Sequence, residues 1–531
     1  MCKYFCIFVP DLILQAMKNR FFLFAMLLSA LPLVAQVHIT MDDPDTWSAE
    51  VLRPYIGQTV IFDMPMIVCT NVNSNYTVSP WRRFQPESHG FKGSAEYNET
   101  VRINNSCMFS ISGISGYHRC GEKIYNLKAK VNSLTSLTWL GGTWHGNTRA
   151  ELNAGLPDLG DYRLLVCGFN LENYYMTLNS MGAKTASDRT RQQKKIQQAL
   201  EHINADIFGL VELQQGDTAV KELVKKLNDA QLVAPGDNTP RNYKYFHDAA
   251  VGTYQKVEFV YDANKVAPIG TPVETNVEVQ NRKKMLCFRE LATGEKFIYS
   301  INHFKAMNTG GAERRENEAK AVMKLYNSYR QNHSIRESDL LVMGDLNCYA
   351  YTEPIAVFVE DNDMLNLHYE FHADSSYSYM YGNMASYIDH AICSTTLFEQ
   401  ITGMSAYHIN SDEDDQYTYD KSTDETMFRC SDHDPVLVGL KLDSTLVYDP
   451  APIINTADIF RGDADKLLIK NAHKSGGQRS FYAIYTVSGL LQDKKEITSA
   501  LFEVDLPQAP GVYIVYVYHD GVAYQRRIIV R

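Results

Sequence analysis

The chain has 531 residues, about three and a half times the ~150 residues of a typical domain, so we expect several domains. Hydrophobic residues make up 45% of the chain and charged residues 21%, which excludes a disordered, collagen-like or small disulfide-scaffold protein. The formal net charge of -11 argues against a uniformly basic surface that coats nucleic acid or an anionic membrane, but it permits a local basic groove.

The first 35 residues have the pattern of an export signal. Lys18 and Arg20 stand in front of an apolar run, Phe21 to Leu31, and small residues follow it. We therefore expect residues 1–35 to be a signal peptide and the mature protein to be secreted or held at the cell surface. The residues before Met17 are unusual in front of such a signal, so we expect translation to start at Met17. A single membrane anchor is the alternative, although the run is shorter than the ~20 residues that a span needs.

Residues 37–158 have the pattern of an all-β accessory module. Short apolar runs such as 59–62 and 66–69 alternate with clusters of Asn, Ser, Gly and Pro, which is typical of strands joined by turns. The tryptophans of this region are candidates for a platform on which bases stack, while a place in the core is the commoner role of such side chains. These tryptophans are Trp81, Trp139 and Trp144.

Residues 160–445 alternate strand-like runs with amphipathic helices, which predicts an α/β domain. One helix is predicted for residues 187–203, because Ile196, Ala199 and Ile203 recur there at helical spacing. Basic residues are concentrated in the first half of this helix.

Six strand-like runs of this domain end in acidic, amide or imidazole side chains. A single histidine or aspartate at a strand end is usually a structural hydrogen-bond partner. Six such ends in one domain instead predict that reactive groups gather at a common rim of a sheet. The residues at these ends are Asn170 and Glu172, Glu212, His303 and Lys305, Asp345 and Asn347, Asp389 and His390, and Asp432, His433 and Asp434.

Two of these motifs, Gly344-Asp-Leu-Asn347 and Ser431-Asp-His-Asp-Pro435, resemble the endonuclease/exonuclease/phosphatase superfamily, with support from Asn170-Leu-Glu172 and Glu212. The resemblance covers residues 160–442. It implies an α/β four-layer sandwich, in which two mixed β-sheets pack face to face and are flanked by helices. It also implies a phosphoesterase that uses a divalent cation.

The resemblance further implies a metal site. Glu212 is expected to be the first ligand, with Glu172 and Asp432 as acidic partners and Asn170 orienting the metal shell or a phosphate oxygen. Carboxylate and amide oxygens without thiolates favour a hard cation over zinc, so Mg²⁺ is expected, with Mn²⁺ or Ca²⁺ as alternatives.

The catalytic roles follow from the same resemblance. His433, with its ring fixed by Asp389, is expected to polarise the attacking water or to steady the phosphoryl oxygens. Asp345 and Asn347 are expected to hold that water and the scissile phosphate. His303 is expected to contact the phosphate or to protonate the leaving oxygen.

Basic residues near the helix at 187–203 are candidates for substrate binding. Arg191 and Lys195, together with Lys305, are expected to follow a nucleic-acid backbone. The alternative is a helix that is merely solvated by its basic side chains.

The order of the motifs looks most like secreted bacterial nucleases of the superfamily, so extracellular DNA or RNA is the expected substrate and partner. A sphingomyelinase or small-molecule phosphatase of the same superfamily is the alternative enzyme. An alternative of another class is a non-catalytic surface protein that binds nucleic acid or glycan.

The segment Ser411 to Glu425 is rich in acidic residues and directly precedes the final motif. We expect a solvated insertion there. A structural Ca²⁺ site is the alternative, although the segment lacks the regular spacing of an EF-hand loop.

Residues 450–531 return to short strands and are expected to form a small β-sandwich after a linker at Asp449–Pro452. Runs such as Gly511–Val515 resemble the C-terminal sorting domain of type IX secretion, which implies recognition by an outer-membrane secretion machinery. An ordinary accessory β-sandwich is the alternative.

Overall fold

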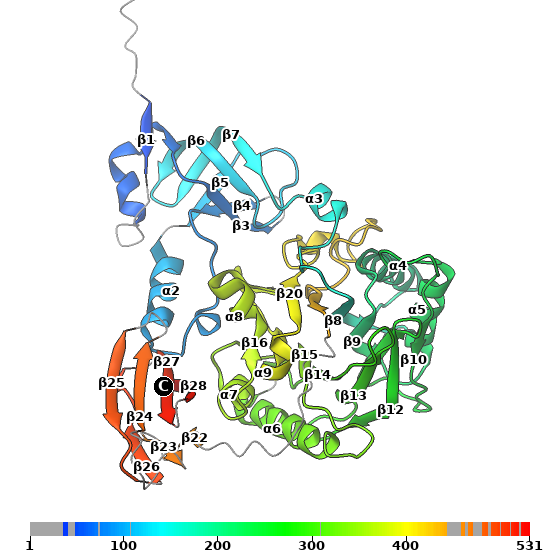
Figure 1. Cartoon of the computed structure of the whole chain (residues 1–531). Coiled ribbons are helices and arrows are strands. Elements are labelled where there is room, and N and C mark those ends of the chain that lie inside the picture. Colours follow the sequence, from blue (N-terminus) through cyan, green and yellow to red (C-terminus); the bar gives the residue numbers. More distant parts are fainter. Residues whose placement is uncertain are drawn as a thin grey trace, which may run out of the picture.

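The computed structural model describes residues 36–40, 48–72, 75–106, 108–307, 310–442, 458–461, 466–470, 480–486, 490–499, 501–509, 511–519 and 522–530 (Figure 1). The predicted signal peptide at residues 1–35 and the predicted linker at residues 449–452 lie outside them. In this described part of the chain, no helix combines the length and the apolar character needed to cross a membrane.

The N-terminal barrel, residues 36–154, is built on a closed ring of strands. β6 pairs with both β3 and β7, and the ring continues through β4 and β5, with β5 and β7 parallel. Closure removes the free sheet edges of these strands. The strands are β1 (Val37–Ile39), β2 (Thr59–Phe62), β3 (Met66–Val72), β4 (Asn75–Ser79), β5 (Phe109–Ser112), β6 (Lys123–Ser133) and β7 (Ser136–His145).

This barrel confirms the predicted β module, but its connections also contain helices that were not predicted. These are α2 (Ala95–Ser106), α3 (Arg149–Ala154) and 3-10 helices at Ala49–Tyr55 and Pro86–Ser88. Trp139 and Trp144 pack on the barrel core with ring centroids 5.5 Å apart, while Trp81 is exposed. Two of the three tryptophans therefore serve the core.

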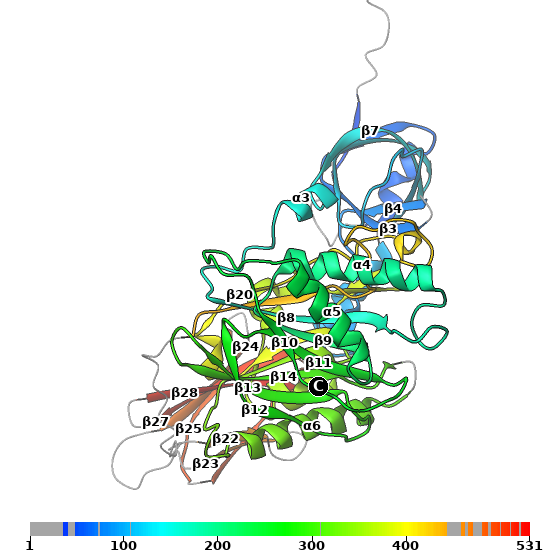
Figure 2. The same ribbon diagram turned by 90° about the vertical axis from the view of Figure 1, so that its right-hand side faces the viewer.

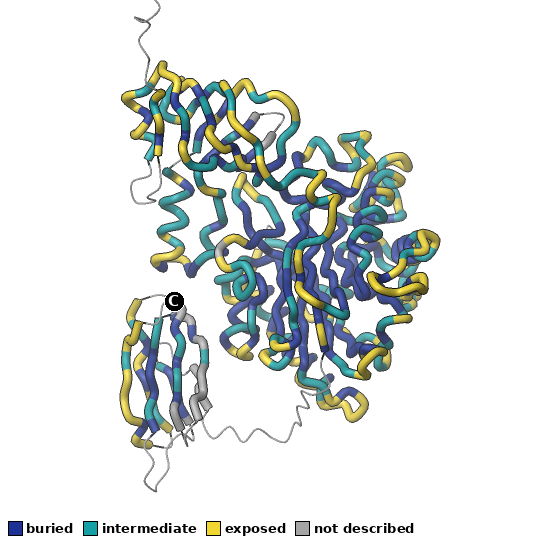
Figure 3. Tube along the Cα trace, turned by 45° about the horizontal axis from the view of Figure 1, so that its top comes forward, coloured by how far each residue is buried: buried dark blue, intermediate teal, exposed yellow. Residues whose placement is uncertain are grey.

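The central domain is the predicted four-layer sandwich. Its two six-stranded sheets have the orders β10-β11-β9-β8-β21-β20 and β12-β13-β14-β15-β19-β16. Apolar side chains from both sheets, including Val166 and Met343, form one buried layer between them. Figure 2 shows α4 and α5 on the outer face of the first sheet and α6 on that of the second. The dark-blue, buried residues fill the interior of this domain (Figure 3).

The first sheet contains β8 (Leu164–Tyr174), β9 (Ile207–Gln214), β10 (Tyr243–Tyr245), β11 (Gln255–Asp262), β20 (Ile401–Ala406) and β21 (Val436–Leu440). The second contains β12 (Val266–Glu274), β13 (Lys283–Glu290), β14 (Lys296–His303), β15 (Leu340–Asp345), β16 (Leu365–Asn366) and β19 (Asp389–Cys393). The helices are α4 (Ala186–Ile203), α5 (Thr218–Asp229), α6 (Ala312–Tyr329), α7 (Glu353–Val359), α8 (Leu367–His372) and α9 (Thr395–Phe398). A hairpin of β17 (Tyr379–Tyr381) and β18 (Met384–Ser386) and 3-10 helices at Ala373–Ser375 and Asp415–Tyr417 complete the domain.

The ends of the strands converge because their register is fixed. β14 and β15 are parallel and place His303 beside Asp345, and the antiparallel β19 places Asp389 on the other side of Asp345. Gly344 makes this approach possible, because its φ is 121° and a Cβ atom there would lie 2.0 Å from the Asn302 carbonyl oxygen. One end of the sandwich therefore collects several of the predicted reactive groups.

The C-terminal region forms two small sheets with an apolar layer between them, as predicted for a β-sandwich. Leu467 and Ile469 contribute to this layer from one sheet, and Val515 and Val517 from the other. The strands are β22 (Asp458–Arg461), β23 (Lys466–Lys470), β24 (Phe481–Thr486), β25 (Leu491–Glu496), β26 (Leu501–Asp505), β27 (Gly511–His519) and β28 (Val522–Val530).

Candidate active site

A connected set of contacts joins all nine residues that the sequence assigns to catalysis or metal binding. They come from the ends of β8, β9, β14 and β15, from the start of β19, and from the segment that precedes β21. The nine are Asn170, Glu172, Glu212, His303, Asp345, Asn347, Asp389, Asp432 and His433.

Three of these side chains form a compact cluster of potential ligands. His303 Nε2 lies 3.5 Å from Glu212 Oε1 and 3.6 Å from Asp345 Oδ2. The ligand atoms of the three residues all lie within 4.8 Å of one another. The second carboxylate oxygen of Glu212 accepts a hydrogen bond of 2.9 Å from the Asn173 main-chain NH, which fixes its orientation.

His433 stands beside this cluster and is oriented by a carboxylate. Its Nδ1 lies 2.8 Å from Asp389 Oδ2, and Ser378 Oγ donates to the same oxygen at 2.7 Å. The opposite ring nitrogen, Nε2, lies 4.0 Å from Asp345 Oδ2 and 3.9 Å from Asp432 Oδ1. The imidazole therefore presents Nε2 to the acidic cluster while Asp389 holds its other side.

Two asparagines, Asn170 and Asn347, orient the acidic groups. Asn170 Nδ2 donates to Asp345 Oδ2 at 3.1 Å, and Asn170 Oδ1 accepts from the Glu172 main-chain NH at 3.0 Å. The main-chain NH of Asn347 donates to Asp345 Oδ1 at 2.9 Å, and the Asn347 side chain donates to the Phe304 carbonyl at 3.2 Å. Hydrogen bonds from Asn170 and Asn347 thus orient both carboxylate oxygens of Asp345.

The main chain is strained at the site. Glu172, Glu212 and Asn347 have φ values of 51°, 63° and 49°, in the left-handed region that residues other than glycine seldom adopt. Such conformations cost about 1–3 kcal/mol each and persist where the surrounding structure enforces them. At these three positions the left-handed main chain turns carboxylate and amide groups towards the site.

The acidic groups carry raised pKa values. Burial, reinforced by the neighbouring Asp432, raises the pKa of Glu172 to about 8. Burial also raises the pKa of Asp345 to about 8, with Asp389 and Glu212 adding to the effect against the opposing His433. Burial and Asp432 raise the pKa of Glu212 as well. The site thus holds more carboxyl groups than the positive charges around them can neutralise.

The two histidines are driven in opposite directions. Burial, reinforced by Arg282, holds the pKa of His303 well below its usual range. Burial also opposes charge on His433, but Asp389 and Asp432 outweigh it and hold the pKa of His433 well above its usual range. The surroundings therefore favour the neutral imidazole at His303 and the imidazolium at His433, so one fold supports both forms.

The residues of the site fit a hard divalent cation. Glu172 Oε2 is buried without a hydrogen-bond partner among the described residues, an expensive arrangement for a carboxylate unless a cation binds it. Among the described residues, the two candidate ligand groups of the site consist of carboxylates and histidines and contain no cysteine. Such a donor set suits Mg²⁺, Mn²⁺ or Ca²⁺.

The predicted substrate-binding residues are placed differently. Lys195 is fully buried, with Nζ 3.3 Å from the Asp424 carbonyl oxygen and 3.8 Å from its carboxylate. Arg191 donates to the Tyr419 carbonyl oxygen. Both side chains thus anchor the segment 411–425 rather than facing the cluster. Lys305 is half-buried two residues after His303.

Two further residues reach the site without having been predicted. The main-chain NH of His303 donates to the Arg282 carbonyl oxygen at 2.7 Å. The Arg282 guanidinium interacts electrostatically with the carboxylates of Glu212 and Asp345. The Tyr379 ring lies 4.7 Å from the His433 ring. Arg282 could have been found from the pairing of β13 with β14, since it directly precedes the partner of Asn302.

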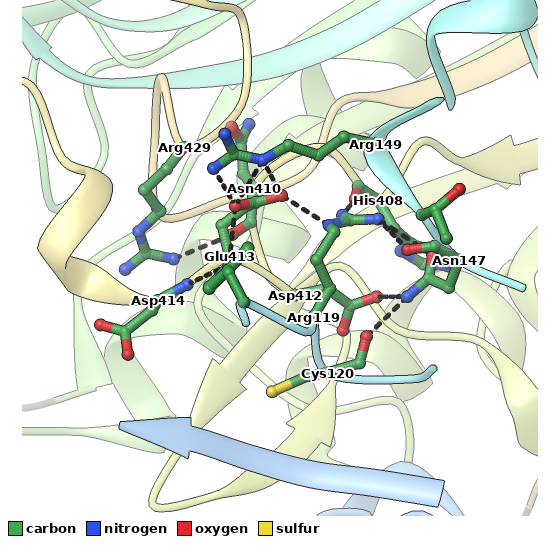
Figure 4. A network of polar contacts seen from close by, with 12 residues as sticks. Arg119, Cys120, Asn147, Arg149, His408, Asn410, Asp412, Glu413, Asp414 and Arg429 are labelled. Atoms are coloured by element: carbon green, nitrogen blue, oxygen red, sulfur yellow. Dashed lines mark hydrogen bonds and ion pairs between the residues drawn. The ribbon is translucent and has the colours of Figure 1, made fainter. Parts of the chain in front are cut away.

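The acidic segment 411–425 corrects the prediction of a solvated insertion. Asp412 and Glu413 have fully buried side chains that pair with arginines of the N-terminal barrel (Figure 4). In the described part of this segment, no three acidic or imidazole groups lie close enough together to hold a Ca²⁺ ion. The acidic residues partly serve an interface within the chain.

Comparison with known proteins gives a family for the central domain. Residues 169–433 match the Endonuclease/Exonuclease/phosphatase family. Among solved structures, the chain is similar to mannosyl-6-phosphatase Bt3783 of Bacteroides thetaiotaomicron, with 18% identity, 52% of this chain and 100% of that chain covered, and a TM-score of 0.37. The human Nocturnin catalytic domain has 14% identity, coverages of 53% and 94%, and a TM-score of 0.36. No curated protein matches the chain.

Proposed function

Because residues 169–433 match the Endonuclease/Exonuclease/phosphatase family, we propose that this protein is a metal-dependent hydrolase of phosphoester bonds. The observation that carries the proposal is the meeting of the oriented His433–Asp389 pair with the Glu212, His303 and Asp345 cluster. A protein that only binds a ligand does not need a buried cluster of carboxyl groups whose negative charges repel one another.

Glu212, Glu172 and Asp432 would hold the cation, with Asn170 orienting the surrounding groups. When bound, the cation, for which Mg²⁺ is our first choice, supplies neutralisation of the negative charge on the phosphate.

The remaining residues divide the chemistry between them. His433, held as a cation by Asp389, stabilises the negative charge that develops on the phosphoryl oxygens. Asp345, whose oxygens are fixed by Asn170 and Asn347, is placed to orient a water and to accept its proton. The neutral His303 ring lies beside the carboxylates of Glu212 and Asp345, where it offers a polar ring nitrogen without adding a charge.

For the substrate, we propose extracellular DNA or RNA as the first candidate. Arg282 supports a phosphate-bearing substrate, because it places a guanidinium near Glu212. The second candidate is a small phosphate ester or a phospholipid. Lys195 and Arg191 favour this candidate, because their charges are taken up inside the protein and do not extend a basic track.

We further propose that the protein is exported, with residues 1–35 as its signal and the C-terminal sandwich as a type IX sorting domain. Export is supported by the apolar run that follows Lys18 and Arg20. The two-sheet architecture of the C-terminal region agrees with the proposed sorting role. N-terminal sequencing of the secreted form, and its mass, would test both parts.

The test of activity uses purified protein with plasmid DNA, RNA, sphingomyelin, a sugar phosphate and a generic phosphodiester, each with Mg²⁺ and with chelator. We expect cation-dependent turnover of at least one substrate and its loss in Glu212→Gln. Turnover of lipid or sugar phosphate without cleavage of nucleic acid would replace the first candidate with the second. Binding without turnover of any substrate would contradict the hydrolase.

A further inference from the structure

The N-terminal barrel and the central domain share a buried charge network. Asp412 and Glu413, in the connection between β20 and β21, have fully buried side chains, and both meet arginines of the barrel. Arg82 pairs with Asp412, and Arg119 donates to Glu413 at 2.5 Å while itself only 1% exposed. Removal of one partner from such a buried pair leaves an uncompensated buried charge, so the pairs hold the two domains in one arrangement.

Other barrel groups complete the network around the same two carboxylates. Arg149 also pairs with Glu413, and Tyr117 donates its hydroxyl to Glu413 at 2.8 Å. Asn147 donates to Asp412 Oδ2 at 2.7 Å. Figure 4 shows side chains of the barrel, among them Arg119, Asn147 and Arg149, converging on the two acidic residues. Each carboxylate therefore has a charged partner from the barrel.

The residues directly before this network hold the final catalytic motif. The main-chain NH groups of Asn410 and Ser411 donate to Asp434 Oδ1 at 2.8 and 2.9 Å. The Asn410 side chain donates to the carbonyl oxygen of His433 at 2.7 Å. The position of Asn410 and Ser411, which the barrel anchors through Asp412, therefore fixes the main chain at His433.

A second route leads from the barrel to the same histidine. Arg82 donates to the Tyr377 hydroxyl at 2.9 Å and lies 4.0 Å above the Tyr377 ring. The next residue, Ser378, donates its hydroxyl to Asp389, and its carbonyl oxygen accepts a hydrogen bond of 2.8 Å from the Asp434 NH. The barrel thus reaches His433 from the side of its partner Asp389 as well.

The hairpin that carries Tyr379 is also attached to the barrel. Ala385 of β18 donates its NH to the Arg83 carbonyl at 2.7 Å, and the Gln85 NH donates to the Ala385 carbonyl at 2.9 Å. The connection between β4 and β5 therefore pairs along the hairpin whose Tyr379 ring packs on His433.

We propose that the N-terminal barrel is a positioning element of the active site, which sets the main chain and ring of His433 through Asp412, Glu413 and Tyr377. The barrel is then a fixed part of the hydrolase and not a tethered binding module. This inference rests on the proposed function, because the position of His433 matters only where His433 acts on a substrate.

The test compares full-length variants on whichever phosphoester the wild-type protein hydrolyses. Glu413→Gln removes the charge that Arg119 and Arg149 share, and Tyr377→Phe removes only the hydroxyl between Arg82 and Asp412. Arg53→Ala, which breaks an exposed pair with Glu50 on the barrel surface, is the matched control. Circular dichroism measures folding, and hydrogen exchange of the Asn410 and Ser411 amides measures docking.

We expect kcat to fall at least tenfold in Glu413→Gln and about threefold in Tyr377→Phe, with KM within twofold and with faster exchange at both amides. The alkaline limb of the kcat profile should move to lower pH, because a displaced His433 loses contact with Asp389. A merely smaller folded fraction would lower kcat equally at every pH. Arg53→Ala should match the wild type.

Faster amide exchange with unchanged kcat and pH profile would overturn the proposal, and so would unchanged exchange and unchanged kcat in both variants. If Glu413→Gln fails to fold, Tyr377→Phe alone decides by the same criteria. A wild-type protein that hydrolyses no phosphoester contradicts the proposed function instead, and the amide exchange then still reports whether the barrel holds the segment.

Discussion

Asp345 shows at the scale of one residue how stability and function oppose each other in this site. Its pKa of about 8 is caused first by burial and then by the nearby Asp389 and Glu212, against the opposing charge of His433. In the unfolded chain an aspartate titrates near ~3.9. The raised pKa therefore favours the folded protein only at low pH, and this stability is lost as the pH rises towards about 8.

We predict that Asp345→Asn raises the melting temperature of the cation-free protein at pH 8 by a few degrees, because the amide removes a buried charge. The same change should lower hydrolysis by about 100-fold or more. Thermal unfolding in chelator and initial rates in Mg²⁺ measure the two effects. Asp229→Asn, in an exposed pair with Lys225, should change neither, and a lower melting temperature for Asp345→Asn would contradict the linkage.

A second prediction concerns Asp389, which keeps His433 protonated. In Asp389→Asn the pKa of His433 should fall, so that activity is lost at a lower pH than in the wild type as the pH rises. At neutral pH kcat should fall by about 100-fold, because the ring also loses its orientation. The pH dependence of kcat measures both effects. An unchanged alkaline limb would show that His433 does not act as a cation.

At the scale of elements, the meeting of β14 and β15 depends on a glycine. A Cβ atom at Gly344 would lie 2.0 Å from the Asn302 carbonyl oxygen, so the strands would have to separate beside His303 and Asp345. We predict that Gly344→Ala lowers the free energy of unfolding by about 3 kcal/mol or more. Denaturant unfolding measures the loss.

The matched control is Gly236→Ala. Gly236 has a φ of 81°, but no described atom beyond Gly236 and its two chain neighbours lies within 4 Å of the position that its Cβ would take. Only backbone strain of about 1 kcal/mol is therefore expected there. Equal losses in the two variants would show that close packing at Gly344 contributes nothing.

Some elements can be predicted from the sequence because their signal is local. The spacing of Ile196, Ala199 and Ile203 predicts a helix over 187–203, and the structure has α4 over Ala186–Ile203. The polar strand ends can also be recognised locally, since each follows an apolar run. The contact of Tyr379 with His433 could not be predicted, because the three-residue strands of its hairpin have no pattern that indicates their place.

At the scale of the whole molecule, the acidic segment 411–425 departs from its sequence-based prediction for a physical reason. A run of acidic residues is usually solvated, and the arginines that bury Asp412 and Glu413 lie 264 to 330 positions away in the sequence. The family resemblance covers only the central domain. No local sequence motif therefore predicts the contact between this domain and the barrel, which becomes visible only in the three-dimensional structure.

The whole domain should respond to the cation that its site fits. We predict that Mg²⁺ or Ca²⁺ raises the melting temperature of the wild-type protein, because the cation binds the folded state and relieves repulsion among buried carboxylates. The increase should be largely lost in Glu212→Gln. Thermal unfolding across a cation titration measures this, and an equal increase in both proteins would place the bound cation elsewhere.

The order of the strands has a consequence for biosynthesis. β21 is the last strand of the central domain, yet it lies between β8 and β20 in the first sheet. A nascent chain that ends before residue 433 therefore lacks this interior strand and also His433. If His433 acts as proposed, a chain at this stage of synthesis hydrolyses no phosphoester, and activity begins only after the last strand of the domain has been made.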